Sequence, residues 1–556
     1  MTNLDLSLLT DLDPDRLPDG QLRPLLRAVL NLVETLVAEV QTLGAENQQL
    51  RDEINRLKGE QGRPTFKPKG PPSGGTDYSS ERERRQAQTW QKGSKLDRIS
   101  IDRVERLAVN RATLPPDAVY KGIEPVVIQD LVLRTDTVRF EREVWYSPAL
   151  GRSYRAPLPP GYEGEFGPGL KALALALAYG ANVSEGKLLE LFRQAGVVVS
   201  SGWLATLLSG DPGGLAAEAR AVEQAGLASS PWQHSDTTGT TVDGESWHCH
   251  LLGNALFTVY RTLPTKNRLA VLELLHGGGP LSYRWDAVAD EYLDWVGVSP
   301  GARRRLAVVP RDQALTETTL TTLLDALRPW VGPQQRAWFR EALALAAYQA
   351  QTDWPVVQTL LCDDAAQYRL VTDELALCWV HEGRHYAKLI AHVPLHRQLL
   401  AAFQDDFWAY YRELLAYRER PTPGEATRLE QRFDELFGRT TGFTLLDQRI
   451  ALTREKQAGL LLVLKHPELP LHNNPAELAA RRRVRKRDVS FGPRSPAGVK
   501  AWDTLMTLAA TTQQLGVSFV AYLQDRLTKV HRIPPLADLI RERAATLNLG
   551  ASWATS

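Results

Sequence analysis

A heptad repeat of apolar residues is the first long pattern in the chain and covers residues 22–57. With Leu26 at position a, β-branched residues or asparagine occupy the later a positions and leucine the d positions: Val33, Val40, Asn47, Ile54, and Leu36, Leu43, Leu50, Leu57. This distribution favours a parallel two-stranded coiled coil, in which a lone Asn at a fixes the register. The pattern predicts a dimerisation helix within residues 20–60, about 54 Å long at about 1.5 Å per residue. It also predicts a homodimer or higher oligomer formed through residues 22–57.

Three segments with different patterns follow the heptads. Residues 61–113 begin with "GRPTFKPKGPPSGGTDYSS", whose composition is typical of a basic flexible linker. Residues 114–165 alternate with period two around "RTDT" and "SPALG", which predicts a small antiparallel β module. Residues 166–228 change to helical spacing, and "SEGKLLELFRQAGVVVSSGWLATLL" predicts two helices, the second capped by Ser200 or Ser201. This is the outline of a helix-turn-helix, so we expect a DNA-binding region there.

The largest segment, residues 229–510, has the order of an α/β domain. Three apolar runs, "SPWQHSDTTGT", "ESWHCHLLGN" and "ALFTVYRTL", are followed by a helical pattern and then by the strand-like "WPVVQTLLCDD" and "ELALCW". This order predicts a mixed sheet. Residues 286–352 and 386–465 are rich in helical pattern and interrupt the order as insertions, and residues 511–556 are predicted to be C-terminal helices.

Composition limits the class of protein. The chain has 556 residues, 43% hydrophobic and 24% charged, with 66 Lys and Arg against 65 Asp and Glu. The N-terminus carries acids where a signal peptide has basic residues, so we expect a cytoplasmic protein without a membrane span. Only three cysteines occur, which argues against a disulfide framework and against a four-cysteine zinc module.

Positive charge is concentrated in one short run although the chain as a whole is nearly neutral. The run follows "LHNNPAE", and its basic residues are candidates for DNA contact: Arg481, Arg482, Arg483, Arg485, Lys486 and Arg487. Such a run is more often a solvated helix face than a binding site, so its position next to other candidate residues carries the argument.

Three acids stand at positions where a fold can present them. Asp236 is predicted to end the first strand of the α/β segment, and Asp363 or its neighbour Asp364 to end the later strand "VVQTLLCDD". Carboxylates at strand ends face a crevice that a ligand can enter. Adjacent strand residues face opposite sides, so the pattern alone leaves Asp363 and Asp364 as alternatives.

The third acid, Glu477, is predicted in the first turn of a helix. Asn473 or Asn474 is a suitable N-cap and Pro475 suits the first turn, where the helix dipole favours an acid. Two unit charges 4 Å apart repel by about 4 kcal/mol at an effective dielectric near 20, so convergence of such acids requires a cation. A pair of Mg²⁺ ions takes oxygen ligands and can activate a nucleophile against a phosphodiester.

Taken together, these motifs resemble the insertion sequence 66 family of DDE transposases. The resemblance rests on the coiled coil, "HSDTTGT", "LLCDDAAQY", "LCWVHEGRH", "LHNNPAE" with the basic "RKRDVSFG", and "LMTLAATTQQLGVSFVAYLQDRL", and it runs from roughly residue 20 to 527. It implies a ribonuclease-H-like fold and a triad of Asp236, Asp363 and Glu477 that binds two Mg²⁺ or Mn²⁺ ions. Asp363 is preferred over Asp364 because its spacing to Tyr368 matches the family pattern.

The resemblance also implies an activity, a cellular location and partners. The activity would be DNA cleavage and strand transfer at the ends of an insertion sequence, by a bacterial, nucleoid-associated protein. Its partners would be terminal inverted repeats, target DNA and accessory proteins of the element. The alternative is a catalytically inactive dimeric protein, derived from a transposase, with a DNA-binding or regulatory role. The chain departs from the family in having no cysteine in residues 114–165, so the β module is expected to fold without metal.

A further family motif follows the second aspartate. Its C-W-x-H-x-x-R pattern corresponds to Cys378, Trp379, His381 and Arg384, and the resemblance places His381 and Arg384 beside the active site, near phosphate. Two local interpretations compete with this one. Cys378, His381 and His385 share a helical face and are three possible zinc ligands, although structural zinc requires four. Cys378 and Trp379 are also plain candidates for core packing.

Asn47 gives a direct test of the predicted coiled coil. We expect Asn47→Val to tighten the oligomer and make it less selective in strand number, because the polar residue at a specifies register at the expense of stability. Light scattering measures both effects, and Gln49→Val outside the a and d positions is the control. A protein that stays monomeric in every form would contradict the coiled-coil assignment.

Overall fold

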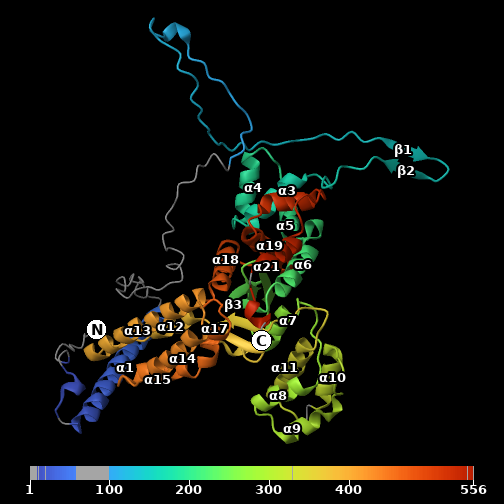
Figure 1. The fold of residues 1–556 in the computed structure, drawn as a ribbon. Helices are drawn as coiled ribbons and strands as arrows, with labels where there is room; N and C mark the ends of the chain where they lie inside the picture. The colour runs from blue at the N-terminus through green and yellow to red at the C-terminus, as the bar shows by residue number, and fades with distance from the viewer. Residues whose placement is uncertain are drawn as a thin grey trace.

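A five-stranded mixed sheet lies at the centre of the computed structural model (Figure 1). The structure describes residues 9, 12–18, 20–57, 99–327, 330–547 and 549–554, so most of the predicted linker lies outside it. The strand order is β5-β4-β3-β6-β7. The strands are β3 (Trp232–Val242), β4 (Glu245–Gly253), β5 (Thr258–Leu263), β6 (Thr359–Cys362) and β7 (Glu374–Leu377).

Both strand directions occur in this sheet, which confirms the predicted mixed sheet. Strands β3, β4 and β5 pair antiparallel, whereas β6 runs parallel to β3 and β7 parallel to β6. One expectation was wrong: Asp236 does not end its strand, because β3 continues to Val242 in a hairpin with β4. The parallel pairing of β3 with β6 ends at His234. Asp236 therefore lies just beyond the parallel half of the sheet.

The helix α19 (Pro496–Gln514) covers the β5 edge of the sheet. The backbone N–H groups of alternate residues on β5 donate to side chains one turn apart on α19. The pairs are Thr258 to Thr511 at 3.4 Å, Tyr260 to Thr507 at 3.1 Å and Thr262 to Asp503 at 2.7 Å. The spacings match, since two strand residues span about 6.6 Å and four helical residues about 6 Å. The edge strand is thereby satisfied and is not open to pairing with another chain.

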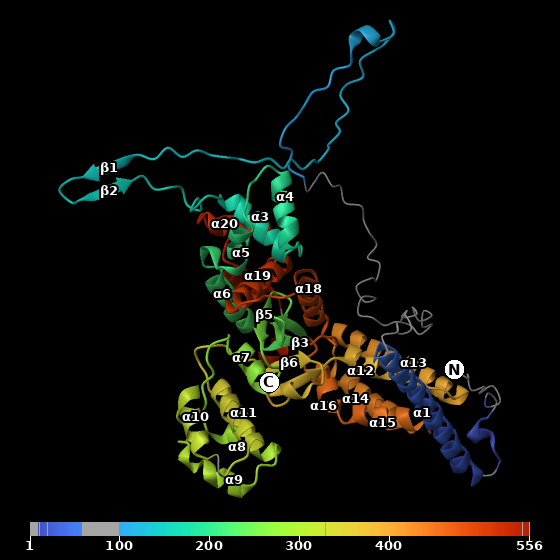
Figure 2. The same ribbon diagram turned by 180° about the vertical axis from the view of Figure 1, so that it is seen from behind.

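Two helical lobes extend from opposite sides of the sheet (Figures 1 and 2). Both correspond to the predicted insertions. The first contains α8 (Ala287–Trp295), α9 (Pro300–Arg305), α10 (Glu317–Ala326) and α11 (Pro333–Gln349). The second contains α13 (Pro394–Glu419), α14 (Pro423–Phe437), α15 (Thr444–Arg454), α16 (Gln457–Leu460) and α17 (Leu462–Lys465), and follows α12 (Trp379–Ala387).

Helices before and after the sheet domain pack together. They are α3 (Pro168–Tyr179), α4 (Glu185–Gln194), α5 (Ser201–Ser209), α6 (Leu215–Ala228), α20 (Phe519–Leu527) and α21 (Leu536–Thr546). Helices α4 and α5 are the predicted pair. Ser200 caps α5, with its Oγ accepting the Trp203 N–H at 3.2 Å, which decides between the two candidate caps. A further helix, α7 (Arg268–Leu275), packs against β4.

Residues 114–165 form less regular structure than the alternation indicated. Their strands are β1 (Val144–Ser147) and β2 (Arg152–Arg155), an antiparallel hairpin that projects away from the helices (Figures 1 and 2). The apolar run at residues 126–133 is exposed and forms no strand. Alternation creates a sheet only when a further strand or helix covers one face, and this chain supplies no such cover in its described residues.

The N-terminal helix α1 (Leu22–Leu57) packs on the chain itself along part of its length. Leu30 and Val37 are buried on either side of Glu34, and the heptad residues next to them, Leu26 and Val33, are half-buried. The later heptad residues are exposed, with Leu36 at 50% and Leu43 at 61%. The surface that docks on the second insertion therefore adjoins the predicted oligomer seam at its start and leaves the rest of the seam exposed. By length and composition alone, Leu22–Arg51 could also cross a membrane, and it is the one such helix among the described residues.

A buried carboxylate fastens α1 to the second insertion. Glu34 accepts hydrogen bonds from the backbone N–H of His392, from the N–H of Val393 at 2.9 Å and from the His396 ring at 2.9 Å. Burial by itself would raise the pKa of Glu34, but these hydrogen bonds outweigh it and the pKa is lowered. The stabilisation is thus present at neutral pH and is lost as pH falls through the lowered pKa.

Replacing this carboxylate tests the docking. We expect Glu34→Gln to lower the free energy of unfolding by about 1–3 kcal/mol near neutral pH, because charge-assisted hydrogen bonds are lost. The difference from the wild type should shrink in acid, where the wild-type carboxylate is protonated. Urea unfolding measures both values. Glu39→Gln on the exposed side of the same helix is the matched control, and an equal loss in that variant would contradict the assignment.

Candidate active site

The three predicted acids line a single cavity of about 250 Å³. Asp236 comes from β3, Asp363 directly follows β6, and Glu477 lies in the first turn of α18 (Asn474–Ser490). These positions are separated by more than a hundred residues in sequence, and the parallel pairing of β3 with β6 brings two of them together. The other residues that line the cavity are Cys378, His381, Arg384, Asn473 and Arg481.

Asn473 joins the three segments that carry the site. Its side-chain Nδ2 donates to the Ser235 carbonyl at 2.7 Å, its Oδ1 contacts the His234 Nδ1 at 2.9 Å, and its backbone N–H donates to the Cys378 Sγ at 3.3 Å. Burial lowers the pKa of His234 to about 3, so the ring is neutral and its Nδ1–H donates to Asn473. Asn473 occupies the N-cap position as predicted, yet its side chain makes no capping bond to α18. It holds the helix to β3 instead.

Asp236 is destabilised as an anion. Its pKa is raised to about 7, because burial and the nearby charges of Asp363 and Glu477 together outweigh a hydrogen bond from the Thr237 N–H and the charge of Arg384. The N–H···O distance from Thr237 is 2.7 Å. A carboxyl group with such a pKa gains free energy from any added positive charge in the cavity.

Glu477 already has a cationic partner. The Arg384 guanidinium donates to both of its carboxylate oxygens, at 3.0 and 2.9 Å. This fork-shaped pairing is the strong form of the arginine–carboxylate interaction. The repulsion expected between the three acids is therefore reduced by Arg384, although the charges of Asp363 and Glu477 still raise the pKa of Asp236.

The structure distinguishes between the two adjacent aspartates. Asp363 lines the cavity, and its Oδ1 accepts the Ala365 N–H at 3.3 Å. Asp364 instead forms ion pairs with Arg369 at 3.0 Å and Lys456 at 2.8 Å. Burial would raise the pKa of Asp364, but these hydrogen bonds lower it overall. Asp363 is thus available to a ligand, while Asp364 fastens the loop to the second insertion.

The second insertion also supports α12, which carries Arg384. Trp379 is completely buried among aromatic rings of that insertion, namely Phe407, Tyr410, Phe433 and Phe437. Cys378 caps α12, since its Sγ accepts the His381 N–H at 3.4 Å, and burial raises the pKa of its thiol to about 11. These contacts agree with a packing role for Cys378 and Trp379. Among the residues that the structure describes, no group of three His, Cys, Asp or Glu side chains is placed to hold a metal ion, so the zinc interpretation gains no support.

The basic run requires a correction. Arg483 is fully buried, donating to the Thr262 hydroxyl at 2.9 Å and lying over the Trp502 ring at 4.6 Å. Lys486 is 4% exposed and donates to the Ala178 carbonyl at 2.7 Å. The prediction that these two contact DNA is wrong, because they are buried and join α18 to strand β5 and to helices α19 and α3. A helix packed on a sheet turns one stripe inward.

The other four basic residues reach the surface to different extents. Arg481 and Arg485 are exposed, and Arg481 also lines the cavity of the acids. Arg482 is half-buried and bonds to Gln513, and Arg487 donates to the Gly239 carbonyl at 2.8 Å. Positive charge therefore continues from the cavity along the outer face of α18.

The chemistry of the cavity suits a hard divalent cation, although its present geometry does not enclose one. Three carboxyl groups share the space, and Asp236 lacks a cationic partner in direct contact among the described ion pairs. However, no set of three ligands in the described part of the chain is close enough to hold an ion as placed. Binding a cation would require the acids to approach and Glu477 to exchange part of its contact with Arg384.

Sequence reasoning did not identify two of the residues that position the site. Lys456 lies in the second insertion and bridges Asp364 at 2.8 Å and Glu382 at 3.1 Å. No motif surrounds it in the sequence. The sequence pattern predicts Asn473 only as a helix cap, because its contacts with β3 come from residues more than two hundred positions away.

Comparison with known proteins identifies a relationship. Residues 344–501 match the family described as Transposase IS66 family, and this segment contains Asp363 and Glu477 but not Asp236. The chain is 32% identical over 329 residues to an uncharacterized protein, y4jO, of Sinorhizobium fredii (strain NBRC 101917 / NGR234). That match covers 58% of this chain and 99% of the relative. No solved structure matches the chain significantly.

The raised pKa of Asp236 predicts a pH effect on stability. Between about pH 4 and pH 7 the folded protein holds a proton on this group that the unfolded chain releases. The contribution of Asp236 to the free energy of unfolding therefore falls as pH rises through this window. In the presence of a chelator, we expect Asp236→Asn to be more stable than the wild type by about 1–3 kcal/mol above pH 7. The gain should vanish below about pH 4.

Urea unfolding across pH measures this difference. Asp243→Asn is the matched control, since Asp243 is an exposed acid in the same hairpin and its backbone φ of 50° suits asparagine. A gain for Asp236→Asn that does not depend on pH would contradict the electrostatic explanation.

Proposed function

Because the chain belongs to the IS66 family of transposases, we propose that it is a DDE transposase that cleaves DNA at the ends of an insertion sequence and transfers the strands to a target. One observation carries the proposal. Asp236, Asp363 and Glu477, from three distant parts of the sequence, line one cavity. The cavity opens beside a helix whose outer face is basic, as attack on a polyanion requires.

The architecture supports a ribonuclease-H-like catalytic domain. Three antiparallel strands are followed by two parallel strands on the other side of β3, in the order β5-β4-β3-β6-β7. Asp236 on the central strand and Asp363 at the end of its parallel neighbour are adjacent by this topology. The two helical lobes are insertions into this domain.

Each residue of the cavity has a proposed role. Asp236, Asp363 and Glu477 would hold two Mg²⁺ or Mn²⁺ ions, which would activate water or a 3′-hydroxyl and stabilise the leaving oxygen. Arg384 keeps Glu477 oriented and compensates its charge, and its remaining donors can bind a phosphate oxygen. Arg481 and His381 line the same cavity and would hold the DNA backbone.

The wider DNA contact would follow the outer face of α18. Arg481 and Arg485 are exposed and supply positive charge on this face, and the half-buried Arg482 and Arg487 lie at its edges. The helix pair α4 and α5 is the proposed reader of the element ends. Pairing of two ends would use the exposed heptad seam of α1, with accessory proteins of the element as further partners.

A second candidate function is a catalytically inactive DNA-binding or regulatory protein of the same origin. It is favoured by one observation, the pairing of Glu477 with Arg384 at 3.0 and 2.9 Å. A permanent ion pair there would leave only two acids for a cation. The two candidate functions differ in whether Glu477 can leave Arg384 to bind a cation.

Incubation with Mn²⁺ and plasmids that carry candidate element ends tests the proposal. We expect cleaved and joined products from the wild type, and a loss of more than about 100-fold for Glu477→Gln and Asp363→Asn, since each removes a charged cation ligand. Asp488→Asn, an exposed acid on the same helix, should keep full activity.

Asp364→Asn completes the comparison. It should lower stability through the lost ion pairs with Arg369 and Lys456 yet retain strand transfer in the folded fraction. DNA binding without any product, together with a melting temperature that Mn²⁺ leaves unchanged, would decide for the inactive alternative.

A further inference from the structure

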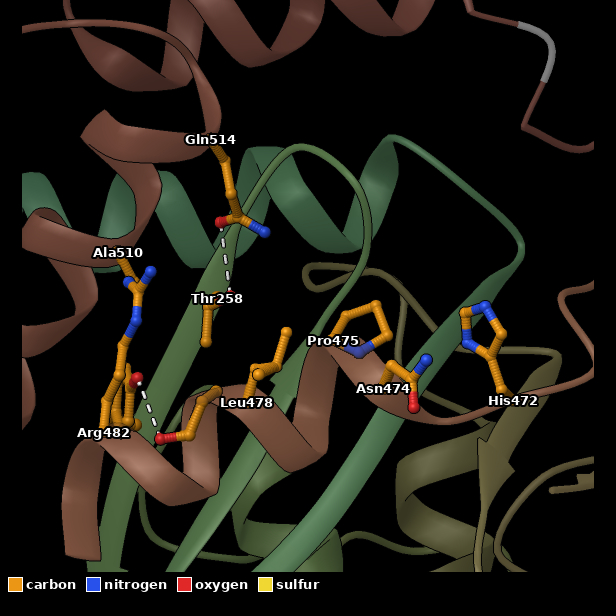
Figure 3. Close-up of a pocket in the computed structure, with 10 residues that line it drawn as sticks. Thr258, His472, Asn474, Pro475, Leu478, Arg482, Ala510 and Gln514 are labelled. Atoms are coloured by element: carbon orange, nitrogen blue, oxygen red, sulfur yellow. Dashed lines mark hydrogen bonds between the residues drawn. The ribbon is translucent and has the colours of Figure 1, made fainter. Parts of the chain in front are cut away.

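A second cavity lies on the other side of α18 from the acids. Its volume is about 440 Å³. Glu477 and Arg481 face the acidic cavity, whereas Asn474, Leu478 and Arg482, each four residues apart on the helix, line the second one (Figure 3). A helix with its side chains is about 10 Å across, so the two cavities are separated by one helix. The proposed function assigns no role to the second cavity.

The walls of this cavity are largely apolar. Pro475 and Leu478 project into it from α18, and Ala510 borders it from α19 (Figure 3). The amide of Gln514, at one rim, is engaged with β5 and the preceding loop, accepting from the Thr258 hydroxyl at 3.2 Å and donating to the Asn254 carbonyl at 2.9 Å. The rim is therefore rigid, and its polar groups are mostly occupied.

Asn474 is a polar residue of the cavity wall whose side chain is open to a ligand. Its side chain is 5% exposed and lies beside Pro475 at the cavity wall, yet it makes no hydrogen bond within the described residues (Figure 3). Its amide therefore faces the open cavity, where a ligand can take up its hydrogen-bonding capacity. Its neighbour Asn473 is fully paired and holds the fold together. The motif thus contains one structural asparagine and one whose hydrogen-bonding capacity is unused.

We propose that this cavity binds a single nucleobase turned out of the DNA whose phosphate lies at the acids, with Asn474 recognising its edge. The proposal rests on the proposed function and extends it. A flat, mostly apolar ligand with a polar edge fits apolar walls and one unpaired amide, and an asparagine amide can form two hydrogen bonds to adenine. Arg482 lines this cavity and Arg481 lines the cavity of the acids. Both would place positive charge next to the DNA backbone that runs from one cavity to the other.

The energetics are compatible with this role. Extruding a base costs a few kcal/mol in lost stacking and pairing, and least where the duplex is already interrupted. Burial of the base against Leu478 and Pro475, and satisfaction of the Asn474 amide, would offset this loss. The extruded base would fix the position of the strand relative to the acids, so the cavity would act in positioning and not in chemistry.

Base extrusion is measured directly with 2-aminopurine, whose fluorescence is quenched by stacking. The probes are nicked duplexes that each carry one 2-aminopurine at a different position next to the nick, with binding followed by anisotropy in the same sample. At saturation the wild type should raise fluorescence several-fold at one position and not at the others. Leu478→Trp should abolish this rise, because the indole fills the cavity.

Two further variants separate recognition from folding. Asn474→Leu should lose most of the signal while its stability stays close to that of the wild type, since the Asn474 amide makes no hydrogen bond within the described residues that the substitution would break. Leu445→Trp places the same indole at an exposed position of α15, away from α18, and should leave the signal unchanged.

The outcomes distinguish the two proposals. Anisotropy that shows binding without a fluorescence rise at any position, or a rise that survives in Leu478→Trp, would overturn base capture and leave the transposase proposal intact. Loss of strand transfer in Asp363→Asn with retained fluorescence would support both. Absence of DNA binding by the wild type would overturn both.

Discussion

The buried side chain of Asn473 is the interaction on which the site depends. It bonds to the backbone and a histidine of β3 and, through its own backbone, to the sulfur of Cys378. These three contacts fix the start of α18 against the central strand and against α12. The direction in which Glu477 points follows from them, because Glu477 is only one turn further along. Hydrogen bonds of this kind, shielded from water, specify geometry more strongly than apolar packing does.

Charge balance is the second constraint on the cavity. Arg384 compensates Glu477, and Lys456 and Arg369 compensate Asp364, so Asp236 is left with the raised pKa. The helical insertion supplies Lys456 and the aromatic core around α12. The second insertion, although it lies outside the sheet, therefore holds in place the loop and the helix that surround the acids. A cation would add positive charge beside Asp236, whose raised pKa shows that its negative charge is incompletely compensated.

Helix α18 divides the functional surface. Its first face presents Glu477 and Arg481 to the acids, its second lines the cavity of Asn474 and Leu478, and its third is packed inside the protein through Arg483. One helix can serve all three environments because residues four apart share a face while neighbours do not. Some residues of the basic run are consequently buried and stabilise the fold, whereas others lie at the surface.

The sequence by itself determined the order of strands and helices in the sheet domain and the long N-terminal helix, and it singled out Asp236, Glu477 and one of two adjacent aspartates as candidates, because periodicity and capping are local properties. Its pattern could not decide between Asp363 and Asp364, since their difference is an ion pair with Lys456 from the distant second insertion. It also could not separate the buried Arg483 from its exposed neighbours, or Asn473 from Asn474. Burial and partner choice are set by contacts between segments hundreds of residues apart, and only the tertiary structure decides those.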